Sequence, residues 1–294
     1  MSAQRCCLAC LLAFSLAACQ PAQVDPSASF EPAADAPSNP ASKAVPGSGA
    51  VQARSGALAT AEHADTPRYK IDISYPRLPP EKAPLRATLH KVAAVAKQEF
   101  MQALPDPDRF PEFADRQMQL LIDFRIVATT RDFVSVRETG MQDTGGAHPI
   151  PIDSTIVYDV RGHHTIPLDD LFDDTDAAHK ALSDYSRAEL TKKIMAQAPK
   201  PGEGSTEAIR EWKTNAQEMI DDGTQPTTQN FANFIVRAGA GPDDASPGLT
   251  LIFPPYQVAA YVYGTQTVDV PGSIFAQYLK PQYRDAFGTQ AANR

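Results

Sequence analysis

The position of the cysteines is the feature that most constrains this chain. All four cysteines lie before residue 20, at positions 6, 7, 10 and 19. The rest of the chain therefore has no thiol with which to form a disulfide, bind a metal or act as a nucleophile. Whatever folds after residue 20 must rely on its apolar core alone, even in an oxidising compartment.

An apolar run, CCLACLLAFSLAA, follows Arg5. The run is too short to span a bilayer comfortably and has the length of the hydrophobic region of a signal peptide. It ends in the residues Leu16-Ala17-Ala18-Cys19, which resemble the bacterial lipobox. In a lipobox the chain is cut before the cysteine, and the thiol takes a diacylglycerol. We expect a signal peptide at residues 1–18 and lipidation at Cys19. The alternative is an ordinary signal peptide with an incidental cysteine.

Residues 19–66 are rich in Pro, Ala and Ser and nearly lack large apolar side chains. Such a segment cannot bury enough surface to offset its ordering entropy. We expect a disordered tether with an r.m.s. reach of about 35–40 Å, which would hold the folded part off the membrane and near the cell wall. Gln20, rather than Asp, follows the cysteine. By analogy with enterobacterial sorting, this favours the periplasmic face of the outer membrane.

The formal net charge is −8. This charge disfavours nucleic acid and anionic lipid as partners, so we expect the lipid anchor to be the only membrane contact. An acidic surface would help to steer a cationic protein toward the chain, although solubility alone also explains an acidic composition.

Hydrophobic periodicity predicts strands and helices from about residue 68. Residues 69–75 alternate as a half-buried strand does, and residues 85–104 have amphipathic helical spacing. Further strands are predicted at 116–130 and 132–150, with a tight hairpin near Asp132 at their junction. Residues 153–172 predict a strand, a turn at Arg161-Gly162 and a short return. Strands are also predicted at 230–238, 248–256 and 258–271, and further helices at 174–196, 205–221 and 272–280. Local hairpins around a helix pair predict an α+β fold, mostly antiparallel sheet with packed helices. We place an N-terminal subdomain at 67–139 and a C-terminal domain at 140–294.

No group of residues in the sequence supports catalysis. There is no G-x-S-x-G elbow, no phosphate-binding glycine loop and no H-E-x-x-H. His163 and His164 are adjacent, and in a strand they would point to opposite faces and chelate a metal poorly. The acidic run 169–176 lacks the spacing of a calcium loop, and capping of a helix start explains it better. We expect no catalytic residue, metal or cofactor. An uncharacterised enzyme stays open as an alternative.

Two stretches have features that are typical of binding segments. The segment TGGAHP, residues 144–149, is predicted to lie between strands. Its Gly145 and Gly146 allow backbone angles that other residues resist, and His148 precedes a proline that holds it extended. Tyr256 directly follows a Pro-Pro break, so we expect it to project, and Tyr261 follows in the same aromatic segment. The alternative for the first stretch is an ordinary turn with a surface histidine, and the alternative for the second is that its aromatic side chains belong to the core. We take these five residues as candidate binding residues.

Four blocks occur in order: GGAH, YDVRGHHTIPLDDLF, QNFANFIV and GLTLIFPPYQVAAYVYGTQTVDVP. Together they resemble the C-terminal domain family of RsiV-type anti-sigma factors, which sense lysozyme. The same domain is found in PdaC-type peptidoglycan deacetylases, ahead of their catalytic domain. The resemblance covers about 140–271, and residues 68–139 resemble the companion N-terminal domain more loosely. It implies an extracytoplasmic α+β domain that binds lysozyme or peptidoglycan.

The chain departs from both relatives, because we expect neither a sigma-binding segment nor a transmembrane helix nor a deacetylase domain. We therefore expect a non-enzymatic lipoprotein that binds and inhibits a lysozyme-like peptidoglycan hydrolase or effector, as an immunity protein does. Residues 144–149 and Tyr256 would occlude the substrate cleft of that enzyme. The alternative is a non-catalytic peptidoglycan-binding module of the envelope.

Overall fold

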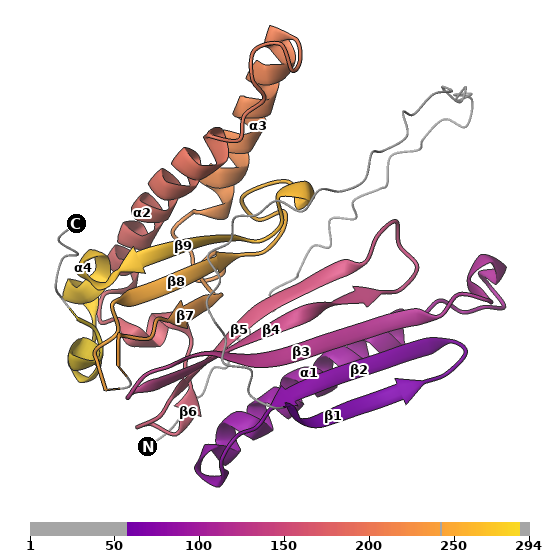
Figure 1. Cartoon of the computed structure of the whole chain (residues 1–294), viewed down its shortest axis with the longest axis horizontal. Coiled ribbons are helices and arrows are strands. Elements are labelled where there is room, and N and C mark those ends of the chain that lie inside the picture. The colour runs from indigo at the N-terminus through magenta and orange to yellow at the C-terminus, as the bar shows by residue number, and fades with distance from the viewer. Residues whose placement is uncertain (1–57, 242, 289–294) are drawn as a thin grey trace, which may run out of the picture. The chain divides into compact units, whose positions relative to one another are not determined.

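The computed structural model describes residues 58–241 and 243–288. The predicted signal peptide, Cys19 and most of the predicted tether lie outside these residues. The described part is an α+β fold with mostly antiparallel pairing, as the sequence predicted (Figure 1). It contains a six-stranded sheet and a three-stranded sheet. None of its helices is both long and apolar enough to cross a membrane.

The first sheet runs in chain order from β1 to β6. Its strands are β1 (Leu58–Asp65), β2 (Tyr69–Pro76), β3 (Met118–Thr129), β4 (Phe133–Asp143), β5 (Ile150–Asp159) and β6 (His164–Thr165). Neighbouring strands are antiparallel except β2 and β3, which are parallel. The long helix α1 (Ala83–Ala103) lies between them in the chain and supplies the crossover that a parallel pair needs.

Two features of this sheet differ from the sequence boundaries. Strand β1 lies within residues 58–65, which the sequence assigned to the tether, and it pairs antiparallel with β2. Its sequence, LATAEHAD, has small and polar side chains without a strong alternation, so periodicity did not reveal it. The predicted boundary between residues 139 and 140 lies inside β4, which pairs with both β3 and β5.

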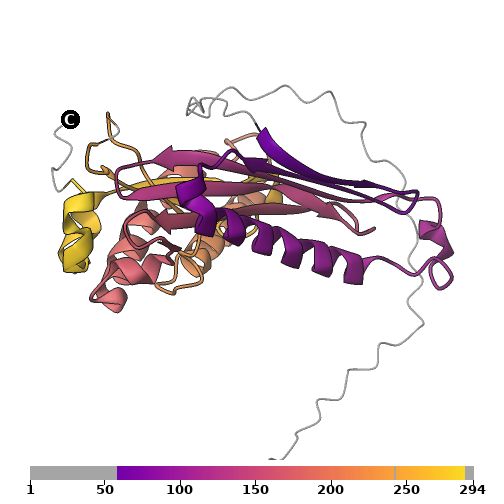
Figure 2. The same cartoon turned by 90° about the horizontal axis from the view of Figure 1, so that it is seen from below.

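Helix α1 lies along one face of the first sheet (Figure 2). Leu85, Leu89 and Phe100 recur at helical spacing and are buried, as the sequence predicted. Fully burying a Leu or Phe side chain stabilises a fold by about 1.5–3 kcal/mol. These side chains form a core with residues of β2, β3, β4 and β5: Ile71, Ile73, Tyr75, Met118, Leu120, Ile122, Phe124, Val134, Val136 and Tyr158.

A second core forms around the three-stranded sheet. This sheet contains β7 (Phe234–Val236), β8 (Gly248–Phe253) and β9 (Gln266–Pro271), all antiparallel. The helices α2 (Thr175–Met195), α3 (Thr206–Gly223) and α4 (Gly272–Phe275) contribute to the same core, and α2 and α3 lie side by side in Figure 1. Phe133 of β4 and Val157 of β5 also belong to this core. At these strands, the face of the first sheet that points away from α1 therefore packs against the second sheet and its helices.

Short 3₁₀ turns complete the fold: η1 (Pro80–Lys82), η2 (Pro111–Phe113), η3 (Leu168–Leu171), η4 (Tyr261–Tyr263), η5 (Ala276–Tyr278) and η6 (Pro281–Ala286). The turn η4 corrects a prediction. A single strand was predicted for residues 258–271, whereas only residues 266–271 form β9. Gly264, with φ of 62°, breaks the extended path before β9, so the aromatic residues ahead of it do not alternate across a sheet.

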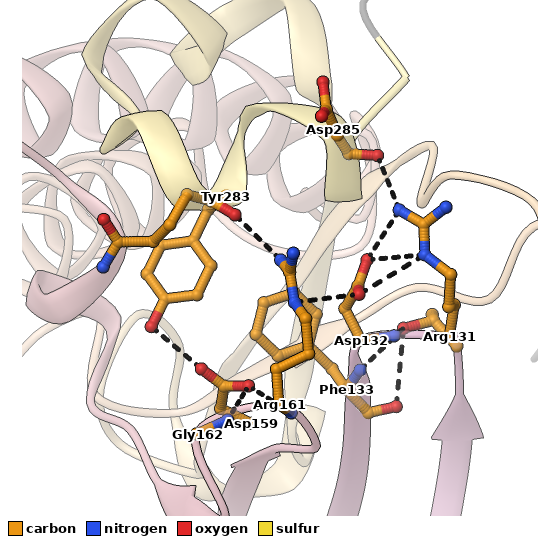
Figure 3. A network of polar contacts seen from close by, with 10 residues as sticks. Arg131, Asp132, Phe133, Asp159, Arg161, Gly162, Tyr283 and Asp285 are labelled. Atoms are coloured by element: carbon orange, nitrogen blue, oxygen red, sulfur yellow. Dashed lines mark hydrogen bonds and ion pairs between the residues drawn. The ribbon is translucent and has the colours of Figure 1, made fainter.

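Two buried carboxylates organise the turns of the first sheet beside the C-terminal segment (Figure 3). Asp159 contacts this segment directly, whereas Asp132 binds Arg131 and Arg161, which donate to backbone carbonyl groups of the segment. Asp132 accepts from Arg131 at 3.0 Å and lies 3.2 Å from Arg161. Asp159 accepts from two backbone N–H groups of the following turn and, at 3.1 Å, from the hydroxyl of Tyr283 in η6. Burial, aided by the charge of Asp159, raises the pKa of Tyr283 to about 12. These contacts fix the predicted turns at Asp132 and Arg161.

Candidate functional site

The loop of residues 144–149 joins β4 to β5, as the sequence predicted. Its base is Asp143, whose Oδ1 accepts from the Gly145 N–H at 3.0 Å. Both oxygens of Asp143 accept from Arg116 Nη2 at 2.9 Å. Burial opposes ionisation of Asp143, but the Gly145 and Arg116 hydrogen bonds outweigh it and lower the pKa of this carboxyl. The loop is therefore held by a charged anchor that sequence reasoning missed.

Gly145 and Gly146 have different roles in this loop. Gly145 has φ of 96°, and a Cβ atom placed there would lie 2.7 Å from the ring of Phe113 in η2. Only glycine fits both demands, since L-residues rarely adopt this backbone region. Gly146 is exposed, and a Cβ there would meet only a carbonyl oxygen at 3.8 Å. The structural need for glycine thus rests on Gly145.

Tyr256 projects from a strained turn after β8. Its φ is 73°, which is uncommon for a residue with a side chain. The Tyr256 N–H donates to the Ala259 carbonyl at 3.0 Å and so closes the turn. The side chain is 54% exposed, in agreement with the predicted projection. The neighbouring Phe253 is fully buried and belongs to the core.

The structure brings three of the predicted residues together from distant parts of the chain. His148, Tyr256 and Tyr261 form what we call the aromatic cluster. The ring of His148 lies 4.8 Å from that of Tyr261 and 6.4 Å from that of Tyr256, and the two tyrosine rings are 5.5 Å apart. The angles between the ring planes are only 24°, 27° and 31°. The cluster is therefore a set of nearly parallel rings.

Hydrogen bonds define the orientation of the imidazole. His148 Nδ1 lies 3.0 Å from the Pro149 carbonyl oxygen, which can only accept, so Nδ1 carries a proton. In the neutral ring Nε2 is then the acceptor, and it lies 3.3 Å from Tyr256 Oη. The loop of residues 144–149 and the Tyr256 turn are thus connected directly through this contact.

The aromatic cluster is open to solvent. Tyr261 is 40% exposed, and the adjacent Val262 is 81% exposed. Exposed aromatic rings held in one place are typical of binding surfaces, because they bury a large area at a small entropic cost. On the other side of η4, Tyr263 accepts from Trp212 Nε1 at 3.0 Å. It lines an apolar hollow of about 200 Å³ with Ile194, Trp212, Asn215, Ala216, Met219, Ala259 and Ala260.

A second depression lies on the first sheet, on the face opposite α1. It has a volume of about 550 Å³ and is lined by Ala61, Asp72, Ile73, Ser74, Leu121, Ile122, Asp123, Thr139 and Gly140. Its carboxylates already have partners. Asp72 contacts His63 at 2.8 Å and Lys70 at 3.2 Å, and Asp123 is bonded to Ser74 and Arg125. We therefore assign the candidate site to the aromatic cluster.

The residues weighed for metal binding have other roles in the described part of the chain. Asp174 caps α2 by accepting from the Ala177 N–H at 3.0 Å, so the capping interpretation is confirmed for this residue, whereas Asp169 accepts from the Thr228 hydroxyl at 2.6 Å. His163 lies in the turn with φ of 56°, not in a strand as the sequence reasoning assumed, and His164 begins β6. No group of three or more His, Cys, Asp or Glu residues able to hold a metal ion occurs in the described ranges.

Comparisons relate the chain to proteins of two kinds. A model of the family described as "Protein of unknown function (DUF3298)" matches residues 169–273. The chain is 25% identical over 223 residues to the Peptidoglycan-N-acetylmuramic acid deacetylase PdaC of Bacillus subtilis (strain 168). That match covers 75% of this chain but only 41% of the deacetylase. The predicted resemblance to PdaC-type proteins is confirmed as a distant similarity. The resemblance to RsiV-type anti-sigma factors stays a prediction.

Two solved structures are also similar. One is a DUF3298 family protein from Pseudomonas aeruginosa PAO1, 17% identical, with a TM-score of 0.49 over 79% of this chain and 95% of that one. The other is a DUF3298 family member from Bacteroides fragilis NCTC 9343, 16% identical, with a TM-score of 0.46 over 78% and 96%. Tyr256 and Tyr261 lie inside the matched range and His148 lies before it. This α+β chain therefore carries a DUF3298 domain match over residues 169–273.

Proposed function

We propose that the chain is a non-enzymatic module of the bacterial cell envelope that binds peptidoglycan through the aromatic cluster. The observation that carries this proposal is the set of three nearly parallel, exposed rings. The similarity to a protein named as a peptidoglycan deacetylase supports the choice of ligand. Because the chain spans 41% of that protein, we transfer the association with peptidoglycan and not the deacetylation.

The geometry of the cluster favours binding because its parts are held before any ligand arrives. The turn at Tyr256, the glycine at 145 and the anchor at Asp143 fix the backbone on both sides. Rigid side chains lose little conformational entropy on binding, so more of the contact energy remains as affinity. We further propose lipidation at Cys19 and a place at the periplasmic face of the outer membrane, from which a tether would reach the wall.

The test is sedimentation of the full chain, purified with its anchor in detergent, alongside purified sacculi. The parent protein is expected to pellet with the sacculi, and Tyr261→Ala is expected to weaken binding about tenfold through the loss of one stacking ring. Met101→Ala is the matched control, since Met101 is an exposed apolar side chain on α1, which contributes none of the three clustered rings. If the parent protein stays in the supernatant, the proposal is wrong.

A second candidate is the capture and inhibition of a lysozyme-like hydrolase. The observation in its favour is Val262, whose 81% exposed apolar side chain beside Tyr261 would suit a protein partner. The net charge of −8 would speed the encounter with a basic enzyme. Titration of the chain into muramidases degrading peptidoglycan, at two salt concentrations, separates the two candidates. Stoichiometric loss of activity, weakened by His148→Ala and Tyr256→Ala, would favour inhibition.

A further inference from the structure

Peptidoglycan offers two chemically different parts to a binding protein, the glycan strand and the stem peptide. We infer that the aromatic cluster binds the glycan strand, a chain of β-linked N-acetylated hexosamines, by stacking a sugar ring on its aromatic faces. This inference rests on the proposed function and makes it more specific.

The arrangement of the rings is the first reason. The planes of His148, Tyr256 and Tyr261 lie within 31° of one another, with centroids no more than 6.4 Å apart. Rings this close and this parallel cover part of one another, but Tyr256 and Tyr261 are still 54% and 40% exposed, so ring surface remains open to a ligand. A pyranose ring has a flat face of C–H bonds with slight positive charge, which is complementary to the negative face of an aromatic ring.

The distribution of charge is the second reason. Stem peptides carry carboxylates, and proteins usually recognise carboxylates with Arg or Lys side chains. Arg116, the basic residue at the base of the loop, is already held by both oxygens of Asp143 at 2.9 Å. The net charge of −8 also disfavours an acidic peptide at long range. N-acetylglucosamine is uncharged, and the lactyl carboxyl of N-acetylmuramic acid is an amide wherever a stem peptide is attached, so sugar rings of the glycan strand can meet the cluster without presenting a carboxylate.

The backbone around the cluster is the third reason. Peptides commonly bind by adding a strand to an open sheet edge or by placing side chains in pockets. The three residues of the aromatic cluster instead lie in the loop 144–149, the Tyr256 turn and η4, and none of them belongs to a strand with which a peptide could pair. Tyr256 Oη lies 3.3 Å from His148 Nε2. When the hydroxyl donates to that nitrogen, its oxygen can still accept from a sugar hydroxyl or acetamido N–H.

Calorimetric titration of the full chain in detergent with chitohexaose, the β-1,4-linked hexamer of N-acetylglucosamine, tests this inference. The second probe is a synthetic Ala-Glu-diaminopimelate peptide with free carboxylates, and sedimentation with sacculi runs in parallel. The expected result is binding of chitohexaose and no binding of the peptide. Tyr261→Ala should weaken chitohexaose binding about tenfold, whereas Tyr261→Phe, which keeps the ring, should stay within about threefold.

Val262→Ala serves as the matched control, since a stacked sugar leaves this side chain unused whereas a protein partner would bury it. We expect it to bind chitohexaose as the parent does. Tyr256→Ala provides a second stacking variant should Tyr261→Ala fail to fold. Binding of sacculi and the peptide without chitohexaose would overturn this inference and leave the proposed function standing. If both alanine variants bind chitohexaose with the same affinity as the parent, the binding site is not the aromatic cluster. Failure to bind sacculi would overturn the proposed function itself.

Discussion

At the scale of single residues, two neighbouring glycines provide a matched pair for stability. Gly145→Ala forces an unfavourable φ of 96° and a Cβ contact of 2.7 Å with Phe113. We expect it to destabilise the protein by about 1–3 kcal/mol. Gly146→Ala has room and is expected to be nearly neutral. Urea unfolding of both variants checks this, and equal losses of stability would contradict the roles given to the two positions.

Glu138 carries a prediction about pH. It is buried in β4, burial raises the pKa of its carboxyl, and a hydrogen bond from Ser154 opposes this only in part. A raised pKa in the folded state contributes stability below the ordinary pKa of Glu, and this stability is lost as the pH rises through the folded-state pKa. Glu138→Gln keeps an acceptor for Ser154 and removes the buried charge.

We therefore expect Glu138→Gln to stabilise the protein at pH 8 and to have little effect at pH 4. The measurement is the difference in melting temperature between the variant and the parent at each pH. A difference that is the same at both values, or that is larger at pH 4, would show that desolvation of the carboxylate is not the cause.

The sequence could predict some site residues and not others for a physical reason. His148 and Tyr256 stand next to prolines and glycines, whose backbone limits are local and visible in the sequence. Asp143 directly before a turn is also a local signal, because Asp side chains often accept from the N–H two residues ahead. Arg116 lies 27 residues before Asp143, and only tertiary folding reveals that they meet.

At the scale of elements, the predicted strand boundaries were wrong where side-chain alternation was weak or misleading. Strand β1 is held by its ladder with β2 and not by a strong apolar pattern. The turn η4 has the aromatic composition of a strand, yet Gly264 and the turn after Pro255 prevent an extended path. Elements with clear periodicity, such as β2, α1 and α2, were predicted almost to their ends.

The C-terminal element η6 is joined to the first sheet through the hydrogen bond from Tyr283 to Asp159. Tyr283→Phe removes a bond to a charged acceptor and should cost about 1–3 kcal/mol. The folded-state pKa of Tyr283 is raised to about 12. Its contribution is therefore complete below the ordinary value near 10 and is lost as the pH rises toward 12.

The measurement is urea unfolding of the parent and Tyr283→Phe at pH 8 and at pH 11. The variant should be less stable than the parent at pH 8, and the difference should shrink at pH 11. A difference that is unchanged at pH 11 would mean that the hydroxyl contributes nothing through this contact. The comparison with the parent cancels the titration of the other tyrosines.

At the scale of the whole described fold, two cores share the first sheet. One core lies under α1, and the other lies around the second sheet and includes Phe133 and Val157 of the first. Because β4 contributes to both cores, we expect residues 58–288 to unfold in a single cooperative transition. Leu85→Ala in one core and Leu190→Ala in the other should each cost about 2–5 kcal/mol.

Hydrogen exchange followed residue by residue distinguishes this expectation from the predicted subdomains at 67–139 and 140–294. In a single cooperative unit each substitution lowers the protection of the slowest amides in both cores by the same free energy. Loss of protection confined to the core that carries the substitution would instead support two independently stable subdomains.

Binding of peptidoglycan through the aromatic cluster can be measured with purified sacculi. That measurement is the dissociation constant of the full chain for purified sacculi, compared with that of the double variant Tyr256→Ala/Tyr261→Ala. We expect saturable binding by the parent, a loss of affinity of about a hundredfold in the double variant if each ring contributes about tenfold, and little dependence of the affinity on salt. Equal binding by both proteins, or no binding by the parent, would contradict it.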